Sequence, residues 1–265
     1  MKIGFFQYAV IYKNRLANLE YIASKIKDER FDLLVLPELF TSGYYFGSKD
    51  EVLEFAEDFD NSPTIDFFTQ LMKNKNGFIS GSIPELYKGK IYNSNFLVGC
   101  NGLVGFSRKI HLPDYEKRLF FSSGDAINVF KCDRMNIGLI TCYDCWFPPL
   151  TSKLRLLGAN IICHSSSFGG DKTPKIIPVR ALENQLFIIS CNRVGTEPFG
   201  NEVETYRGNS QIVDPDGNIL LTSDSNEKLD FVSINIEISN QPSFGSLITK
   251  DFFSEHNRYR IEFKA

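Results

Sequence analysis

The sequence lacks the long apolar run of a membrane-spanning helix and any block of basic residues. No stretch approaches the roughly 18 consecutive apolar residues that identify a membrane span, so we expect no membrane partner. The formal net charge is −3, which argues against a nucleic acid as the main partner. The apolar run at the N-terminus is also too short, before the polar residues 12–15, to predict a secretory signal.

Cysteine is scattered rather than arranged as a disulfide framework. Of the six cysteines, Cys142 and Cys145 form a CxxC motif, and most of the others stand in apolar, strand-like runs. This usage is typical of reduced thiols. We therefore expect a cytoplasmic protein.

Several catalytic and cofactor-binding motifs are missing. There is no G-x-S-x-G, G-x-G-x-x-G or Walker A sequence, so neither a hydrolase serine nor a nucleotide cofactor is indicated. The three histidines are far apart, which disfavours a metal site. Spacing leaves a Cys–His pair open, with His164 as its best candidate, although a buried core histidine is the favoured interpretation of that residue.

What the sequence does contain is alternation between apolar strands and amphipathic helices. Such alternation predicts an α/β fold, and 265 residues that are 43% hydrophobic can bury a core as one large domain, residues 1–265. Strands are expected at residues 2–8, 32–36, 77–86, 90–98, 102–107, 128–132, 135–141, 160–164, 186–191, 206–213, 218–221 and 230–236. Helices are expected at residues 14–27, 64–73, 148–158 and 174–184, and a loop at residues 114–125.

Three polar residues, Glu38, Lys109 and Cys142, each follow an apolar strand. Each also has an ordinary explanation. Glu38 could cap a loop, Lys109 could form a solvated basic pair with Arg108, and Cys142 could be a small buried hydrophobe. Strand ends on one edge of an α/β sheet nevertheless gather at a common cleft. A cysteine between a strand and a helix can also place backbone N–H groups near charge that develops on a bound carbonyl. Together the three residues favour a catalytic site.

Three motifs in the expected order carry a family resemblance. They are LPELFTSGY at residues 36–44, RKIHL at residues 108–112 and TCYDCWFP at residues 141–148, with supporting elements at residues 180–184, 192–195 and 208–210. On these motifs the sequence resembles the nitrilase superfamily of carbon–nitrogen hydrolases over nearly its whole length. It departs from many members at Pro149, Cys145 and Trp146.

The resemblance implies a four-layer αββα sandwich, paired into a homodimer or higher homo-oligomer, with no metal and no organic cofactor. It assigns Glu38 as the general base, Cys142 as the nucleophile that forms a thioester, and Lys109 as an oxyanion ligand. The backbone N–H of Tyr143 would be the second oxyanion donor. A second glutamate of the family corresponds best to Glu116, which would position the substrate and Glu38.

Other parts of the site are less determined. Tyr44, Trp146 and Phe168 are candidates for the pocket wall, with ordinary core packing an equal alternative. The aromatic C-terminal tail, residues 241–265, would leave an apolar patch exposed if it were free, so we expect it at a subunit interface, as in the resembling family, with docking on its own subunit as the alternative.

The favoured substrate is a small amide, because an amide gives an oxyanion that suits Lys109 and a backbone donor. An N-carbamoyl amine, suggested by Trp146 before Phe147-Pro148, and a nitrile remain alternatives with the same catalytic residues. A hypothesis from another class is a thiol–disulfide oxidoreductase that uses Cys142 and Cys145. Such a protein would not require Glu38 or Lys109.

Overall fold

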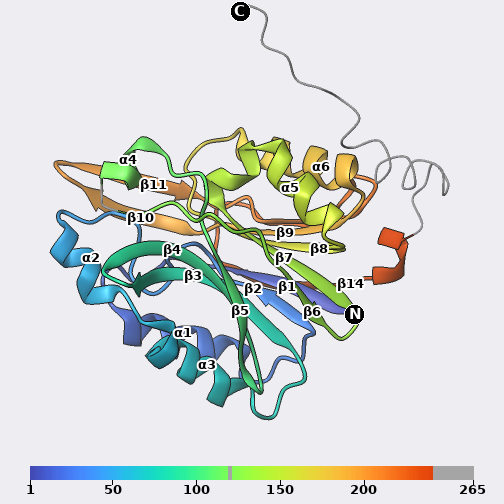
Figure 1. The fold of residues 1–265 in the computed structure, drawn as a ribbon, viewed down its shortest axis with the longest axis horizontal. Coiled ribbons are helices and arrows are strands. Elements are labelled where there is room, and N and C mark those ends of the chain that lie inside the picture. The colour runs from blue at the N-terminus through green and yellow to red at the C-terminus, as the bar shows by residue number, and fades with distance from the viewer. Residues whose placement is uncertain (119–120, 241–265) are drawn as a thin grey trace, which may run out of the picture.

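The computed structural model describes residues 1–118 and 121–240 (Figure 1). In this part of the chain two six-stranded sheets pack face to face, and helices cover both outer faces. The α/β class and the predicted αββα layering are therefore confirmed.

The two sheets share one plan. The first has the order β14 (Lys228–Ser233), β1 (Lys2–Gln7), β2 (Leu33–Val35), β3 (Phe78–Tyr87), β4 (Lys90–Gly99), β5 (Gly102–Arg108). The second has the order β13 (Ile219–Thr222), β12 (Gln211–Val213), β9 (Phe187–Cys191), β8 (Ile161–Ser165), β7 (Met135–Thr141), β6 (Val129–Cys132). In each sheet three central strands run parallel and the outer strands are antiparallel. Parallel strands end at the same edge, which is where a site can form.

Alternation along the strands builds separate cores. In β1, Ile3 and Phe5 belong to the core between the sheets, together with Ile137 of β7. Phe6 belongs instead to the core under the helices, with Ile22. A strand buried on both faces needs apolar residues at every position, which is why these strands read as continuous apolar runs.

Four helices cover the sheets close to their predicted positions. They are α1 (Arg15–Ile26), α3 (Pro63–Met72), α5 (Pro148–Leu156) and α6 (Thr173–Asn184). Figure 1 shows α1 and α3 over the first sheet and α5 and α6 over the second. On α1, Leu19, Ile22 and Ile26 face the core, whereas Leu16 is 62% exposed. Asn18 is buried instead, and its side-chain amide donates to the carbonyls of Ile11 and Thr41.

Short helical segments escaped the sequence interpretation. Helix α2 (Lys49–Phe55) begins after Ser48, whose hydroxyl accepts the N–H of Glu51. The expected loop at residues 114–125 contains α4 (Asp114–Arg118). The structure also contains the short 3₁₀ helices η1 (Phe59–Asn61), η2 (Cys142–Trp146) and η3 (Ile236–Asn240).

A separate two-stranded hairpin, β10 (Val194–Phe199) and β11 (Glu202–Arg207), was not predicted. The strand expected at residues 206–213 is wrong, because Gly208 and Asn209 have φ of 69° and 61° and divide it between β11 and β12. An extended strand cannot continue through two such residues. The strand expected at residues 230–236 also ends early, since Ile236 begins η3.

Among residues 1–118 and 121–240, no helix is long and apolar enough to cross a membrane. The tail at residues 241–265, expected at a subunit interface, lies outside the described residues. Its location stays a prediction.

Candidate active site

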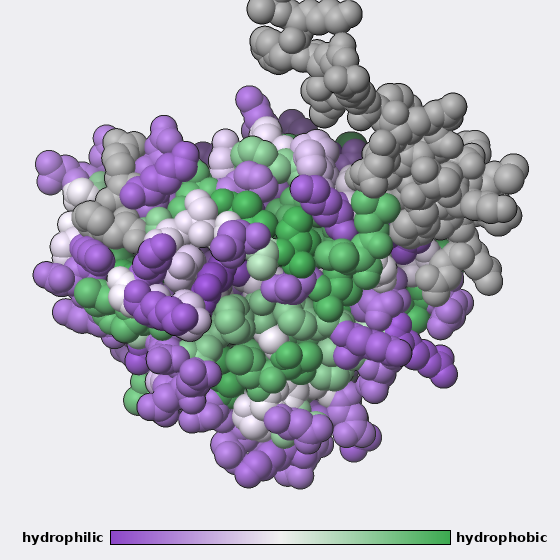
Figure 2. Space-filling model, in the orientation of Figure 1, coloured by the Kyte–Doolittle hydropathy of each residue, from purple (hydrophilic) through white to green (hydrophobic). Residues whose placement is uncertain are grey.

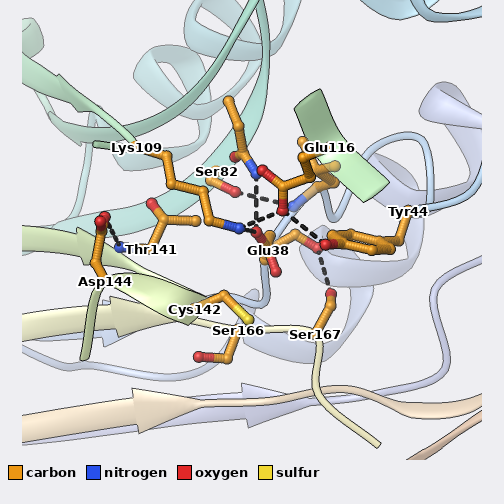
Figure 3. Close-up of polar contacts among 12 residues, drawn as sticks. Glu38, Tyr44, Ser82, Lys109, Glu116, Thr141, Cys142, Asp144, Ser166 and Ser167 are labelled. Carbon is orange, nitrogen blue, oxygen red and sulfur yellow. Dashed lines mark hydrogen bonds and ion pairs between the residues drawn. The ribbon is translucent and has the colours of Figure 1, made fainter. Parts of the chain in front are cut away.

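The structure brings Glu38, Lys109 and Cys142 together, although they come from both sheets (Figure 3). Glu38 follows β2, Lys109 follows β5, and Cys142 follows β7. The backbone N–H of Glu38 donates to the carbonyl of Ser166 over 3.2 Å, and the Ser167 hydroxyl donates to the carbonyl of Glu38 over 3.1 Å. The loop after β2 is thereby bound to the loop after β8, so the site spans the seam between the sheets.

A second, more deeply buried contact fixes the two sheets relative to one another. Asn95 of β4 donates its amide to the Ile140 carbonyl of β7 and to the Ser165 hydroxyl of β8, over 3.0 and 3.2 Å. Ser80 of β3 donates to the Asn95 side-chain oxygen over 2.8 Å. All of these groups are buried. Such fully bonded polar contacts fix relative positions more sharply than apolar packing does.

Lys109 is the centre of the charged cluster. Its Nζ lies 2.7 Å from Glu38 Oε1 and also pairs with Glu116 Oε1. All three side chains are almost wholly buried. Glu116 lies in α4, and its Oε1 also accepts the Tyr44 hydroxyl over 2.6 Å. Asn93 of β4 donates to Glu38 Oε1 over 2.8 Å.

Burial and the neighbouring charges together shift the pKa values in the cluster. Burial raises the pKa of Glu38 to about 7, Lys109 opposes the rise and Glu116 adds to it. Burial disfavours the Lys109 ammonium, but Glu116 and Glu38 outweigh it and raise the pKa of Lys109. Glu38 Oε2 and Glu116 Oε2 are buried without a hydrogen-bond partner. A carboxylate oxygen that is buried and unpartnered, on a group with a pKa near neutrality, is suited to accept a proton.

Cys142 has an unusual backbone conformation, with φ of 43° in the left-handed region. Its side chain lies beside Glu38 and Ser166 in Figure 3, at the turn between β7 and η2. Burial raises the pKa of the Cys142 thiol and Glu38 raises it further, whereas Lys109 and the backbone N–H of Ser167 lower it. A thiol with a raised pKa needs a base to become a nucleophile.

His164 touches Cys142, but not as the partner of its thiol. Nε2 of His164 lies 3.0 Å from the Cys142 carbonyl oxygen, and Nδ1 lies 2.9 Å from the Ser190 hydroxyl. A carbonyl can only accept, so Nε2 carries the proton. Burial lowers the pKa of His164 to about 4, which keeps the ring neutral at physiological pH. The contact holds the strained backbone of Cys142, as expected of a core histidine with satisfied hydrogen bonds.

Asp144 connects the cysteine and lysine segments. Its Oδ1 accepts the backbone N–H of His111 and lies 2.9 Å from His111 Nδ1. Its Oδ2 accepts the backbone N–H of Thr141 over 3.2 Å. The His111 ring stacks on Phe147 with centroids 3.6 Å apart. These contacts fix the start of η2 relative to Lys109.

The other candidate pocket residues have varied surroundings. Tyr44 lies in the cluster, as described. Tyr143 is 38% exposed and packs edge-on against Phe147 beside a surface cavity of about 510 Å³. Trp146 is equally exposed and its indole N–H donates to Thr173 Oγ1. Phe168 is half-buried, and Asn192 bonds both its backbone N–H and its carbonyl. Substrate contacts of these aromatic residues stay predictions.

The environment of Cys145 disfavours the thiol–disulfide hypothesis. Cys145 is fully buried in the apolar core beneath α5 and α6. Burial raises the pKa of its thiol to about 12, so it is a poor source of thiolate. Arg180 of α6 donates to its carbonyl over 2.9 Å. In residues 1–118 and 121–240, no group of three or more His, Cys, Asp and Glu side chains is arranged to hold a metal ion.

Sequence reasoning gave no role to Asn93, which donates to Glu38, to Asp144, which connects the cysteine and lysine segments, or to Glu197, which accepts the backbone N–H of Tyr44. A weak signal existed for Asn93, because Asn93, Ser94 and Asn95 interrupt the apolar strand β4 with polar residues. Asp144 stood inside the cysteine motif, but its bonding partner His111 is distant in sequence.

The sequence model of one protein family, described as "Carbon-nitrogen hydrolase", matches residues 5–238. A nitrilase of Pyrococcus abyssi is 32% identical over 219 residues, which are 82% of each chain. An (R)-stereoselective amidase of a Pseudomonas species is 31% identical over 209 residues, covering 78% of this chain and 74% of the relative. Among solved structures, Saccharomyces cerevisiae Nit3, a member of branch 10 of the nitrilase superfamily, superposes with a TM-score of 0.80 at 25% identity. That match covers 91% of this chain and 92% of Nit3.

Proposed function

The chain belongs to the carbon–nitrogen hydrolase family, and from this premise we propose that it hydrolyses a small non-peptide amide through a thioester on Cys142. The family establishes the reaction class. The nucleophile, the roles of the surrounding residues and the substrate are our proposal.

In the first half of the reaction, Glu38 Oε2 accepts the proton of the Cys142 thiol, and Sγ attacks the amide carbon. A carbon–sulfur bond forms and the carbonyl oxygen becomes an oxyanion, which Lys109 Nζ and the backbone N–H of Tyr143 stabilise. Glu38 then gives its proton to the leaving nitrogen. The carbon–nitrogen bond breaks, ammonia or an amine departs, and the acyl group remains as a thioester.

In the second half, Glu38 accepts a proton from water, and the hydroxide formed attacks the thioester carbon. The carbon–sulfur bond breaks, the carboxylic acid leaves, and the Cys142 sulfur recovers its proton from Glu38. Glu116 keeps Lys109 in place through both halves. A base with a pKa near the working pH serves both proton transfers well, since it must gain and lose a proton in each half.

The observation that best supports this proposal is the asymmetry of the Glu38 carboxylate. Its Oε1 is held by Lys109 and Asn93, whereas its Oε2 is buried without a partner. Two fixed contacts orient the group and leave one oxygen free for proton transfer. Most buried carboxylate oxygens are hydrogen-bonded; Glu116 Oε2 is also without a partner, but the raised pKa of about 7 belongs to Glu38.

The direct test is mass spectrometry of the protein with a slow amide substrate. We expect an acyl adduct on Cys142, and we expect Cys142→Ala to lose hydrolysis while keeping the native unfolding curve. Substantial turnover by the alanine variant would overturn the thioester mechanism.

We propose an amide in preference to a nitrile as substrate, with an N-carbamoyl amine as the nearest competitor. Attack on a nitrile gives a thioimidate nitrogen that must be protonated before water adds, whereas attack on an amide gives an oxyanion beside Lys109. An ammonia-release screen should compare kcat/KM for amide, ureido and nitrile compounds that carry the same acyl group. A nitrile preferred by more than about tenfold, or roughly 1.4 kcal/mol of transition-state free energy, would reverse this assignment.

We further propose that the protein forms a homodimer or a higher homo-oligomer. On the outer helical face, Leu157, Val179 and Leu182 are each more than half exposed. Figure 2 shows other apolar side chains where β5 and β6 lie side by side, around a cavity of about 380 Å³. Light scattering should show more than one subunit, and truncation after Asn240 should give monomers or insoluble protein. A soluble truncated dimer with native activity would exclude a role for the tail in assembly.

We also propose the cytoplasm as the compartment, because the nucleophile must stay reduced. All six cysteines are free thiols in the structure. An oxidising compartment would expose Cys142 to disulfide formation and sulfur oxidation. Fractionation of cells that produce the protein, probed with an antibody, would test this.

A further inference from the structure

A second buried ion pair lies behind the loop that carries Tyr44. Arg193 Nη1 pairs with Glu197 Oε1, and both side chains are fully buried. The Arg193 guanidinium also lies 4.3 Å from the centre of the Tyr206 ring and donates to the Val10 carbonyl. The mechanism proposed above makes no use of this pair.

Glu197 is bonded directly to the loop that follows Glu38. Its Oε2 accepts the backbone N–H of Tyr44 over 2.8 Å and that of Tyr45 over 3.4 Å. Gly43, with φ of 87°, packs so closely that a Cβ there would stand 2.5 Å from Glu197 Oε1. Glycine is needed at this position both for the backbone conformation and for the space. The loop therefore rests on the Glu197 carboxylate with no side chain between them.

From that anchored backbone, the Tyr44 side chain reaches into the active site. Its hydroxyl donates to Glu116 Oε1, the same oxygen that pairs with Lys109. Lys109 in turn pairs with Glu38. A continuous series of contacts thus runs from the hairpin of β10 and β11, through Tyr44, to the catalytic cluster.

We propose that Glu197, neutralised by Arg193, is a positioning residue for the hydrolysis. It fixes the Tyr44 backbone so that the Tyr44 hydroxyl holds Glu116 against Lys109. The inference rests on the proposed function, since it assigns Glu197 a part in positioning the groups that stabilise the oxyanion.

The charges of the pair suit this task. A hydrogen bond to a carboxylate is stronger than one to a neutral oxygen, so Glu197 holds the Tyr44 N–H firmly. A carboxylate buried alone would be costly, and it would add a third negative charge near Glu38 and Glu116. Arg193 cancels that charge. The loop gains a strong acceptor without a change in the net charge around the cluster.

The test is a double-mutant cycle between Glu197 and the Tyr44 hydroxyl. Tyr44→Phe removes only the hydroxyl, and Glu197→Asp keeps a negative charge for Arg193 but withdraws the carboxylate from the Tyr44 N–H. We expect each single variant to lose about tenfold in kcat, the effect of one hydrogen bond in a buried network, with little change in KM. The double variant should lose no more than Tyr44→Phe alone, because both changes break the same series of contacts.

Two further variants make the test specific. Glu204→Gln is the matched control, because Glu204 stands opposite Glu197 in the hairpin and is partly exposed; its kcat should be native. Glu197→Gln keeps an oxygen for the Tyr44 N–H but leaves Arg193 unpaired. If it folds, it should retain more of the native kcat than Glu197→Asp does.

Native kcat in Glu197→Asp, or losses in kcat that multiply in the double variant, would overturn the positioning role. The unfolding free energy of every variant shows whether a loss in kcat merely follows a loss of folded protein. The acyl adduct on Cys142 of the native protein is an independent control. If the adduct forms and the cycle shows no coupling, only this inference fails; if no adduct forms, the proposed function fails.

Discussion

Among residues 1–118 and 121–240, two clusters pair a fully buried cation with buried carboxylates, and they differ in the balance of charge. At Arg193 one cation meets one carboxylate, Glu197, whose other oxygen is bonded to backbone N–H groups. At Lys109 one cation meets two carboxylates, and each keeps an unpartnered oxygen. The balanced pair holds a loop. In the unbalanced cluster burial raises the pKa of Glu38 to about 7, while Lys109 opposes the rise and Glu116 adds to it. A buried carboxylate with such a pKa can gain and lose a proton near neutral pH.

The largest loss of kcat is expected for Glu38→Gln. Glutamine keeps an oxygen for Lys109 and Asn93 but cannot accept the thiol proton, so kcat should fall by about a thousandfold, as for the loss of a general base. The protein should remain folded by circular dichroism. Steady-state kinetics beside Glu197→Gln, which should lose far less, would show which cluster is reactive. A Glu38→Gln variant with a tenth of the native kcat would contradict the assignment.

Removal of each cation should affect stability in different ways. Arg193→Met leaves one buried carboxylate unpaired and should lower the free energy of unfolding by about 3–5 kcal/mol. Lys109→Met removes the cation that opposes the raised pKa of Glu38, so Glu38 takes up a proton more readily and the loss of stability should be smaller at pH 5 than at pH 8. Urea unfolding of both variants at the two pH values tests this. Equal losses for Lys109→Met at both pH values would mean that Glu38 does not take up a proton in the variant.

The pH dependence of the native enzyme should also report the unbalanced cluster. In the proposed mechanism Glu38 acts as the base when it is ionised, so kcat/KM should rise with pH and level off above about pH 7. One unit below that pKa the value should be about tenfold lower than the plateau. Stability should change in the opposite direction: the folded protein binds the Glu38 proton more tightly than the unfolded chain does. This contribution is complete below pH 4.5 and is lost as the pH rises to about 7. A flat profile between pH 5 and 8 would be inconsistent with a base of this pKa.

The smallest effect is expected at Cys145. Its thiol lies in the apolar core and does not belong to either charge cluster, so Cys145→Ser should keep kcat within about threefold. It should lower stability by about 1–3 kcal/mol, since a hydroxyl replaces a buried thiol. Kinetics and thermal unfolding would check both values. A large loss of activity, together with reduction of insulin disulfides by the native protein, would instead favour the thiol–disulfide hypothesis.

The sequence identified candidate site residues at the ends of strands more readily than the residues that form hydrogen bonds around them. Glu38, Lys109 and Cys142 were expected at one edge of a sheet because each follows an apolar strand, and they do meet, but across the seam between the two sheets. Glu116 came from the family resemblance, and α4, which carries it, was read as a loop. Asn93 and Glu197 were missed, because their partners lie far away in sequence and a hydrogen bond leaves no periodic pattern.

The elements of the fold also differ in how clearly the sequence pattern indicated them. Buried strands such as β7 and β8 were evident as apolar runs, since both of their faces are covered. The hairpin of β10 and β11 has no such run, because it carries Gly195, Pro198 and several charged residues. The strand predicted through Gly208 failed for a backbone reason, namely two successive residues with positive φ. Helix α2 carried a readable signal in Ser48 and Glu51 that the interpretation did not use.

Because the site lies across both sheets, dividing the gene into two fragments would separate its residues. Cleavage in the connection between α4 and β6 would give one fragment with Glu38, Lys109 and Glu116 and another with Cys142. Under the proposed mechanism, neither fragment alone would be active. The second fragment also carries β14, which pairs with β1 along its whole length, from Lys2 opposite Ser233 to Gln7 opposite Lys228. Co-expressed fragments would therefore recover activity only on reassembly. The enzyme could then serve as a split reporter, in which ammonia release shows that two proteins fused to the fragments have associated.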